Sequence, residues 1–315
     1  MSINKVFILA AGLGSRMGSL GKSLPKVLWP IFERPMLDLE IEFWKDRGGE
    51  EFYINLHHQV EKIQSQSFLH NSKIHLLLEP ELLGVGGAIY NLKRNFIDMD
   101  KIILSTSDQF FHLEIEEVRK DGENLENYSV FLYSIPTQKW QKHNGIKVNK
   151  EDELCDILAP EAIEDTVYPT YSGLSLLDVN SLENKNGPQS FFGTIANYRE
   201  KKIKVKPIDQ FYWDFGTFDR YVNHTEKIWE ILIKEESAAE SFVNFLVQKG
   251  AVNLSQVQGT GYNSENYSIY SIGQGFIIGI GMNQSHLIEC LAELKIEPSI
   301  SRGVVFSGAF HAQSS

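Results

Sequence analysis

A glycine loop followed by basic residues stands near the start of the chain. The apolar run Val6–Ala10 leads directly into residues 11–15 (Ala-Gly-Leu-Gly-Ser), and Arg16 and the pair Pro25-Lys26 follow. A buried strand that ends in such a loop aligns backbone N–H groups that no side chain shields from a ligand. Together with the two cations, these amides suit the binding of a triphosphate.

Two other nucleotide-binding loops fit this segment less well. Met17 stands where the dinucleotide motif Gly-x-Gly-x-x-Gly needs its third glycine, and no Gly-Lys-Ser/Thr closes a Walker loop. The next strand-like run, Phe52–Leu56, ends in His57-His58 without the acid that would hold a ribose. The simplest alternative is a tight strand-to-helix turn with basic neighbours.

The order of the segments LAAGLGSRM, LPK and ERPML resembles the signature of the nucleotidyltransferases that make NDP-sugars from a nucleoside triphosphate and a sugar 1-phosphate. The resemblance covers roughly the first 225 residues, because several motifs occur in the right order. It implies that the loop and its two cations bind the triphosphate, through Ala10, Ala11, Gly12, Leu13, Gly14, Ser15, Arg16 and Lys26. It also implies that Arg16, Lys26 and Asp108 are catalytic.

A second glycine-rich segment, LLGVGGA at residues 82–88, lies between a strand-like run and a helical pattern. Glycines there let the backbone approach a base or a ribose at the start of a helix. The family has a similar segment on the nucleoside side of its pocket, which implies nucleotide binding by Gly86 and Gly87. The alternative is a loop whose glycines serve only its turn geometry.

Two aspartates follow strand-like runs. Asp108 comes after Ile102–Ser105, and an acid at the carboxyl end of a strand can reach Mg²⁺, which prefers one or two carboxylates plus phosphate oxygens. The resemblance makes Asp108 the first metal ligand and Asp214, in the segment Trp213–Gly216, the second. Taken alone, each aspartate is more often a helix cap.

The acceptor side departs from the family. Gly145, Ser172 and Gly173 resemble residues that contact the sugar, although turn chemistry alone would also explain them. Where the family has Glu-Lys-Pro, whose lysine holds the sugar phosphate, this chain has Leu-Ala-Pro at 158–160. The residues that could substitute for this lysine are Lys147, Lys150 and Arg199, and nothing in the sequence selects among them.

The composition excludes several classes of protein. A net charge of −11 argues against broad binding of nucleic acid, and no run approaches the ~20 apolar residues of a membrane span. The N-terminus leads directly into a core strand, which predicts no signal peptide. Cys155 and Cys290 form neither a metal-binding spacing nor a disulfide framework. We therefore expect a cytoplasmic protein.

The alternation of elements predicts the architecture. Strand-like runs alternate with helical patterns over the first half: strands Lys5–Ala10, Phe52–Leu56, Ile74–Leu78 and Ile102–Ser105; helices Pro35–Arg47, Val60–Leu69 and Gly86–Phe96. This is typical of an α/β, doubly wound, mostly parallel sheet with helices on both faces, the Rossmann-like fold of the family. Ligands of such folds bind at the carboxyl ends of the strands.

Shorter segments follow from Tyr128. They predict an acceptor lobe, residues 128–236, that covers the sheet of the nucleotide-binding lobe, residues 1–127. The two lobes form one nucleotidyltransferase domain, residues 1–236. The remainder, 237–315, is an α+β extension without a hexapeptide repeat, and we expect it to serve packing or the formation of a homo-oligomer.

These features predict a Mg²⁺-dependent enzyme that joins a nucleoside triphosphate, preferably GTP, to a sugar 1-phosphate. Within the family, GLGSRM followed by LGxGGA resembles bacterial enzymes that activate heptose or mannose phosphates. Two alternatives stay open. One is a transferase of the same fold with a non-sugar phosphate acceptor; the other is a regulatory subunit that binds NDP-sugar without turnover.

Overall fold

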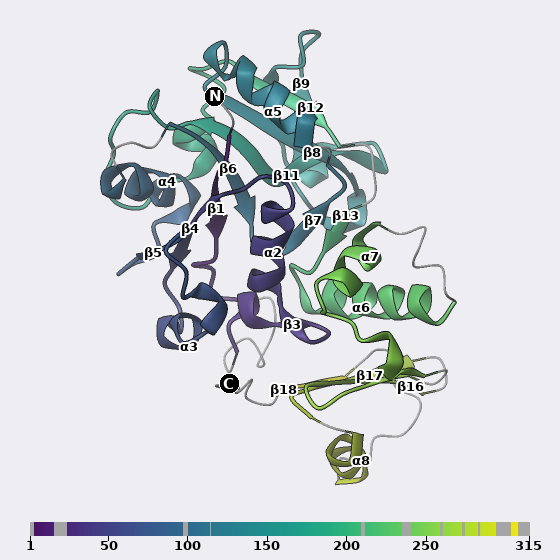
Figure 1. Cartoon of the computed structure of the whole chain (residues 1–315). Helices are drawn as coiled ribbons and strands as arrows, with labels where there is room; N and C mark the ends of the chain where they lie inside the picture. The colour runs from purple at the N-terminus through teal and green to yellow at the C-terminus, as the bar shows by residue number, and fades with distance from the viewer. Residues whose placement is uncertain are drawn as a thin grey trace.

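A nine-stranded sheet forms the centre of the computed structural model, which describes residues 3–15, 24–96, 100–113, 115–208, 212–234, 241–258, 261–272, 275–282, 284–293 and 304–307 (Figure 1). Its main path is β10-β9-β11-β6-β1-β4-β5, and β8 and β12 join it through β11. The strands are β1 (Lys5–Leu9), β4 (Glu51–Leu56), β5 (Ile74–Leu78), β6 (Lys101–Thr106), β8 (Val130–Gln138), β9 (Gly145–Val148), β10 (Leu154–Leu158), β11 (Val167–Asp178) and β12 (Ile203–Pro207).

Four neighbouring strands, β6, β1, β4 and β5, run parallel. Phe7 of β1 lies opposite Tyr53 on one side and Leu104 on the other. These strands are short apolar runs because helices cover both of their faces. The predicted α/β class with a mostly parallel central sheet is confirmed.

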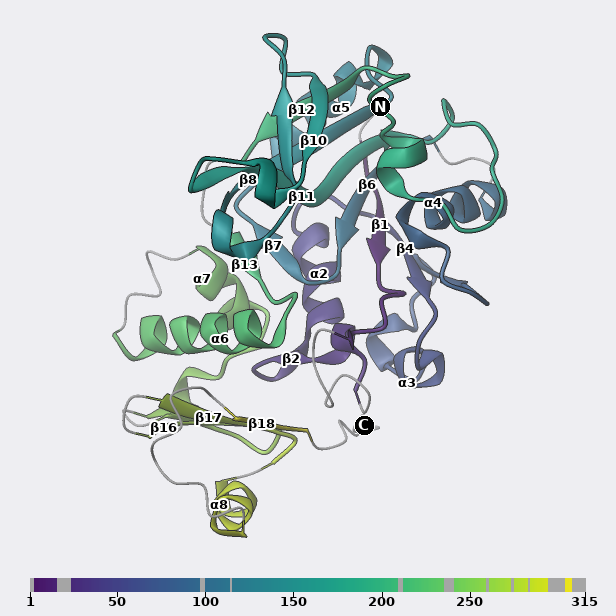
Figure 2. The ribbon, with the colours of Figure 1, turned by 180° about the vertical axis from the view of Figure 1, so that it is seen from behind.

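The two faces of the sheet pack into separate apolar cores. Val6 and Ile8 lie in one core with helix α2, whereas Phe7 lies in the other with helix α4, since successive side chains of a strand point to opposite faces. Figure 2 shows α4 from behind the sheet. The helices are α2 (Met36–Lys45), α3 (Val60–Gln64), α4 (Gly84–Asn95), α5 (Ile115–Glu123), α6 (Phe218–Ile233), α7 (Ser241–Gln248) and α8 (Gln284–Glu293).

The second lobe extends the sheet instead of covering it. Strand β11 is 12 residues long, so it pairs antiparallel with β6 through its second half and with β8 along most of its length. The expectation of a lobe laid over the sheet is therefore wrong in this respect. The domain boundary near residue 236, between the nucleotidyltransferase domain and the extension, stays a prediction.

A small ribbon brings distant parts of the chain together. Strand β7 (Gln109–Phe111) pairs antiparallel with β13 (Tyr212–Asp214), and Asp214 lies opposite Gln109. The loop after β6 and the segment before α6 therefore end side by side.

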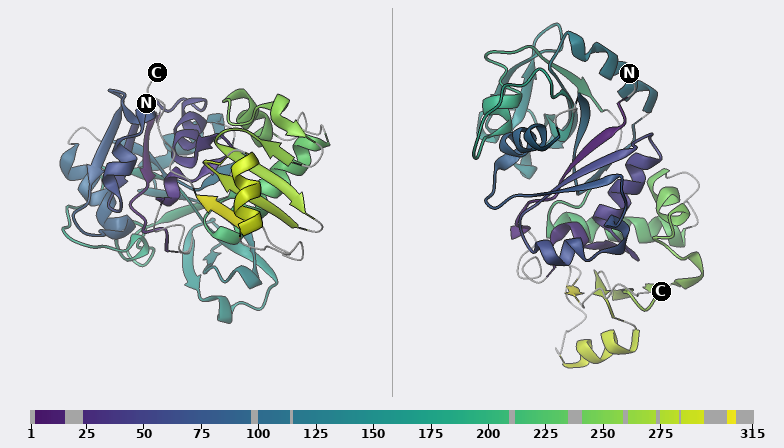
Figure 3. Two further views of the ribbon diagram at one scale, coloured as in Figure 1. Left: turned by 90° about the horizontal axis from the view of Figure 1, so that it is seen from below. Right: turned by 60° about the vertical axis from the view of Figure 1, so that its left-hand side comes forward.

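The C-terminal extension packs onto the same core. Its sheet has the order β14-β15-β16-β17-β18, with β14 (Val257–Gln258), β15 (Gly261–Asn263), β16 (Tyr267–Ile272), β17 (Gly275–Ile280) and β18 (Val304–Ser307). The ring of Phe32 lies 5.0 Å from that of Tyr262 and 5.2 Å from that of Tyr267. Helix α8 lies on the face of this sheet that is turned away from the rest of the molecule (Figure 3). The predicted α+β extension is confirmed.

Among the helices that the structure describes, none is both long enough and apolar enough to cross a membrane.

The packing of α7 gives a test of how tightly the extension is joined to the core. The buried ring of Phe242 lies 4.8 Å from Phe110 and 5.2 Å from Trp213. We expect Phe242→Ala to lower the free energy of unfolding by about 3–5 kcal/mol, because it removes a large ring and leaves a cavity. Denaturant unfolding measures this change.

The matched control is Leu254→Ala, since the Leu254 side chain is 52% exposed. Its expected effect is within about 0.5 kcal/mol. Equal effects of the two substitutions would contradict the packing of α7 against the ribbon.

Candidate functional site

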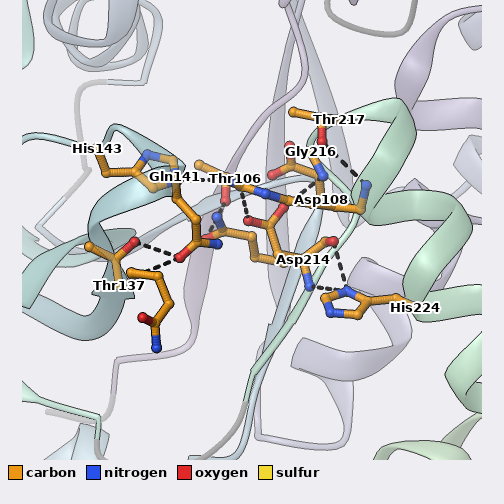
Figure 4. A network of polar contacts seen from close by, with 12 residues as sticks. Thr106, Asp108, Thr137, Gln141, His143, Asp214, Gly216, Thr217 and His224 are labelled. Atoms are coloured by element: carbon orange, nitrogen blue, oxygen red, sulfur yellow. Dashed lines mark hydrogen bonds and ion pairs between the residues drawn. The ribbon is translucent and has the colours of Figure 1, made fainter. Parts of the chain in front are cut away.

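Two buried carboxylates converge at the end of the β7–β13 ribbon. Asp108 follows β6 and Asp214 ends β13, and the amide of Phe215 donates to the carbonyl of Asp108 at 2.8 Å. A Cβ atom built on Gly216 would lie 2.9 Å from Oδ1 of Asp214 and 3.0 Å from Oδ2 of Asp108. Both carboxylates thus border one small space, as Figure 4 shows.

Each carboxylate pairs with a cation from another segment. Lys26 donates to Oδ2 of Asp108, and Arg220 donates through Nη1 to Oδ2 of Asp214. The second guanidinium nitrogen of Arg220 lies 2.7 Å from Nε2 of His143. Neither aspartate caps a helix: Asp108 leads into β7, and Thr217 is the N-cap of α6. Such pairing is required because two buried carboxylates repel each other and lose their hydration.

The electrostatics of the pair favour added positive charge. Burial raises the pKa of Asp214, the neighbouring charge of Asp108 raises it further, and Arg220 lowers it in part. Burial also lowers the pKa of His224 to about 4, so this imidazole is neutral near pH 7. Its Nδ1 lies 2.8 Å from the carbonyl oxygen of Asp214 and therefore holds the end of β13 in place.

The donor set fits a divalent ion that is shared with a phosphate ligand. Gly216 leaves open the space that a Cβ would fill between the two carboxylates. Within the described part of the chain, no group of three or more His, Cys, Asp or Glu side chains could hold a metal. Two carboxylates completed by phosphate oxygens and water are the arrangement that Mg²⁺ commonly takes.

A cavity of about 310 Å³ adjoins Asp108 at the carboxyl ends of the parallel strands. Its lining comes from the glycine loop, from the ends of β4, β5 and β6, and from the start of α4: Leu9, Ala11, Gly12, Lys26, Asn55, Glu79, Leu82, Gly84, Val85, Thr106, Ser107 and Asp108. Gly14 adopts a φ of +63°, and a Cβ there would lie 3.5 Å from Cβ of Lys26. The loop that the sequence singled out therefore lies beside its predicted lysine.

Two polar residues of this cavity were missed by the sequence analysis. Asn55 and Glu79 are buried, and Nδ2 of Asn55 donates to Oε1 of Glu79 at 2.8 Å. Oδ1 of Asn55 accepts from the amide of Ala10 at 2.7 Å. Burial raises the pKa of Glu79, and the hydrogen bonds from Asn55 and Leu83 oppose this in part. A signal existed in the sequence, because both residues stand at the carboxyl ends of neighbouring parallel strands.

Gly86 and Gly87 pack against the segment 187–194. Their amides donate to the carbonyl of Gln189 at 3.0 and 3.3 Å. A Cβ on Gly86 would lie 2.7 Å from the carbonyl oxygen of Ser190. Gly84 and Val85 of the same motif line the cavity. Nucleotide binding by Gly86 and Gly87 stays a prediction, and close packing accounts for both glycines.

The predicted acceptor residues occupy different surroundings. Gly173 has a φ of +87° at the register shift of β11, and a Cβ there would lie 2.7 Å from Cγ2 of Thr106. Gly145 packs against Ile163 and Tyr168, and Ser172 is buried with its hydroxyl accepting from the amide of Leu174. Gly173 is thus brought beside the segment that carries Asp108.

The remaining predicted residues belong to the glycine loop or follow it directly. Leu13 is exposed, and Ser15 ends the described part of the loop. Arg16 lies outside the described residues, so its predicted role in catalysis stays a prediction.

A third carboxyl group lies behind the pair. Glu40 of α2 is fully buried, and its Oε1 accepts from Ser105 at 2.6 Å and from Trp44 at 2.8 Å. No hydrogen-bond partner of Oε2 is found among the described residues. Burial raises the pKa of Glu40 to about 8, and the charge of Asp108 adds to this. Glu40 is therefore mainly protonated at pH 7.

Comparison with known proteins finds similarity to nucleotidyl transferases. The nucleotidyl transferase family matches residues 5–158. A D-glycero-α-D-manno-heptose 1-phosphate guanylyltransferase of Campylobacter jejuni is 24% identical over 229 residues, which are 69% of this chain and 96% of that protein. The bifunctional protein GlmU of Methanococcus maripaludis is 35% identical over 190 residues, but these cover only 41% of its length.

The fold of the chain is similar to that of a solved structure. HddC from Yersinia pseudotuberculosis, in complex with GMP-PN, has a TM-score of 0.59 and is 23% identical. The similarity covers 72% of this chain and 99% of HddC. It establishes a shared fold over that part of the chain.

The buried carboxyl of Glu40 gives a test by pH. Its pKa in the folded protein, about 8, lies above the usual value of 4.5, so the folded state binds more protons between these values. This group therefore makes the free energy of unfolding fall as the pH rises through that window. We expect Glu40→Gln to reduce the fall in melting temperature between pH 5 and pH 8, because the amide cannot ionise.

Glu116→Gln is the control, since the Glu116 side chain is 77% exposed. It should leave the pH dependence of the melting temperature unchanged. An identical pH dependence in the wild type and Glu40→Gln would refute the buried neutral carboxyl.

Proposed function

Since residues 5–158 match the nucleotidyl transferase family, we propose that this protein joins a nucleoside triphosphate to a sugar 1-phosphate and releases pyrophosphate. The observation that carries the proposal is the convergence of Asp108 and Asp214 beside a cavity formed by the glycine loop and Lys26. An oxygen of the sugar phosphate forms a bond to the α-phosphorus. The bond between this phosphorus and the β-bridging oxygen breaks, and pyrophosphate leaves with the electron pair.

The acceptor phosphate is itself the nucleophile, so the protein needs no covalent intermediate. Its residues must align the two reactants and offset the charge that grows on the phosphates. The loop amides from Ala11 to Ser15 bind phosphate oxygens in this proposal, together with Lys26 and Arg16. Asp108 and Asp214 hold Mg²⁺, which when bound neutralises charge on the α-phosphate.

We propose GTP as the nucleotide. A carboxylate can accept two parallel hydrogen bonds, and guanine presents two adjacent donors, N1–H and the N2 amino group. The adenine and cytosine edges place an unprotonated ring nitrogen at the equivalent position, and uracil flanks its single N–H with two carbonyls. Glu79, which lines the cavity, supplies such an acceptor. The relative from Campylobacter jejuni is named as a guanylyltransferase, and HddC was solved with GMP-PN.

For the acceptor we propose a sugar 1-phosphate of the manno series, of heptose or hexose size. The support is the name of the relative from Campylobacter jejuni, which matches over most of its own length. The missing lysine at 158–160 favours a second candidate, a non-sugar phosphate acceptor bound by the same fold.

A pyrophosphate-release assay tests these proposals. It combines each of four nucleoside triphosphates with a panel of acceptors: α-D-mannose 1-phosphate, D-glycero-α-D-manno-heptose 1-phosphate, α-D-glucose 1-phosphate and phosphocholine. Turnover of a manno 1-phosphate with GTP is the expected result. Turnover with phosphocholine alone would establish the non-sugar acceptor, and binding of GDP-mannose without any turnover would indicate a regulatory subunit.

The carboxylate pair predicts the effect of a single substitution in this assay. Asp108→Asn should lower turnover by about 10²-fold or more, the scale of losing one preorganised charge-stabilising group, while the protein stays folded. Pyrophosphate release and thermal melting measure the two effects. Excess chelator should abolish the wild-type activity.

Asp100→Asn is the matched control, because Asp100 pairs with Lys5 at 3.2 Å and is partly exposed. It should leave turnover unchanged. Wild-type activity of Asp108→Asn, or full activity in chelator, would exclude the metal assignment.

The proposed contact with guanine predicts a change in base preference. Glu79→Gln should lower kcat/KM for GTP by about tenfold or more relative to UTP, since the amide offers one acceptor oxygen in place of two. Glu81→Gln, an exposed neighbour two residues on, is the control and should keep the preference. An unchanged ratio of GTP to UTP in folded Glu79→Gln would remove Glu79 from base selection.

A further inference from the structure

The acceptor's phosphate lacks an obvious binding cation. Leu158 ends β10 and Ala159 precedes a short 3₁₀ turn. Neither side chain is charged, so neither can bind the phosphate as the family's lysine does. Lys147 and Lys150 are exposed, and the guanidinium of Arg199 lies 5.8 Å from the ring of its neighbour Tyr198. The surroundings of these three residues give no evidence that any of them lies beside the carboxylate pair.

Arg220, in contrast, lies beside the carboxylate pair. It lies in the first turn of α6, and its side chain is only 18% exposed. One nitrogen donates to the carboxylate of Asp214, and the other lies 2.7 Å from Nε2 of His143. The guanidinium therefore bridges the carboxylate pair and the loop before β9.

His143 is fixed by the strands of the predicted acceptor side. Its carbonyl accepts from the hydroxyl of Tyr168 at 2.7 Å, and the carbonyl of the next residue, Asn144, accepts from Thr170 at 2.8 Å. Tyr168 and Thr170 belong to β11, which also carries Gly173. The plane of the guanidinium is thus set by its contacts with Asp214 and His143.

Lys26 and Arg220, the two cations paired with the carboxylates in the described part of the chain, take separate positions. Lys26 pairs with Asp108 and lines the nucleotide cavity. Arg220 pairs with Asp214 and contacts the loop before β9. A reaction between two phosphates requires positive charge on each of them, and this division provides one cation for each.

From this arrangement, and resting on the function proposed above, we infer that Arg220 receives the phosphate of the acceptor. A buried phosphate dianion needs a charged partner, and the planar fork of arginine matches two phosphate oxygens. With a divalent ion bound, Asp214 would attract Arg220 less strongly, because the ion would repel the guanidinium. The donors of Arg220 would then be available to the acceptor phosphate, while His143 keeps the guanidinium oriented. Arg220 thereby replaces the lysine that is missing at 158–160.

The test compares Arg220→Lys and Arg220→Ala with the wild type. Steady-state kinetics give KM for the acceptor and for GTP, and calorimetry in the presence of Mg²⁺ gives the Kd of α-D-mannose 1-phosphate and of inorganic phosphate without GTP. We expect the acceptor KM and both Kd values to rise at least about tenfold in Arg220→Ala, the scale of losing a charge-assisted hydrogen bond. The KM for GTP should change by less than about threefold, and added guanidinium chloride should restore part of the acceptor binding.

Arg119→Ala is the matched control, because Arg119 also pairs with a carboxylate, Glu116 at 2.7 Å, on the surface of α5. It should change neither KM. Arg220→Lys keeps the charge that balances buried Asp214 but loses the fork. It therefore gives a folded variant if Arg220→Ala is unstable, with the same direction of effect on acceptor binding.

The outcomes separate this inference from the proposed function. Unchanged acceptor KM and phosphate Kd in a folded Arg220 variant would overturn the role of Arg220, even if the wild type turns over a sugar 1-phosphate. Equal losses for GTP and acceptor, without rescue by guanidinium, would also overturn it and indicate a purely structural role. If the wild type turns over no sugar 1-phosphate but binds inorganic phosphate through Arg220, the proposed function fails and the phosphate site stands.

Discussion

The repulsion between two buried carboxylates is the constraint on which the site depends. Asp108 and Asp214 border one space at Gly216, and neither is exposed enough for water to screen its charge. Lys26 and Arg220 offset this charge from two directions. The elements that carry these cations must therefore be held firmly, because a shift of either would leave a buried charge unpaired.

Aromatic packing provides this rigidity. The ring of Trp29, just after Lys26, meets that of Tyr221, just after Arg220, edge to face at 5.1 Å. The hydroxyl of Tyr221 donates to the carbonyl of Pro30. The segments that carry the two cations are thus fastened directly to each other, and each cation keeps its distance to the carboxylates.

The C-terminal extension completes the same structure. After Lys26, strands β2 (Pro30–Ile31) and β3 (Arg34–Pro35) form an antiparallel hairpin with Phe32 and Glu33 at its turn. The amide of Glu33 donates to the carbonyl of Ala251 at 3.0 Å, and its carboxylate accepts from Ser264. Arg34 donates to the carbonyl of Lys249 at 2.8 Å. Burial raises the pKa of Glu33, and the hydrogen bond from Ser264 opposes this. The contacts of the extension thus cover the hairpin that follows Lys26, which is the packing role expected of it.

By itself, the sequence determined the order and type of the elements and the segments that meet at the site. The apolar runs and helical spacings are local patterns, so the predicted strand Ile74–Leu78 has the observed bounds and the predicted helix Gly86–Phe96 ends one residue after the observed one. Tertiary structure alone decided which side chains pair. Arg220 and His143 are 77 residues apart, and Asn55 and Glu79 are 24 apart, so no local pattern relates them. The pairing of β7 with β13 and the antiparallel entry of β11 into the sheet bring Arg220 near His143, and the parallel pairing of β4 with β5 brings Asn55 near Glu79. Hydrogen bonds and buried charges act only over such short distances.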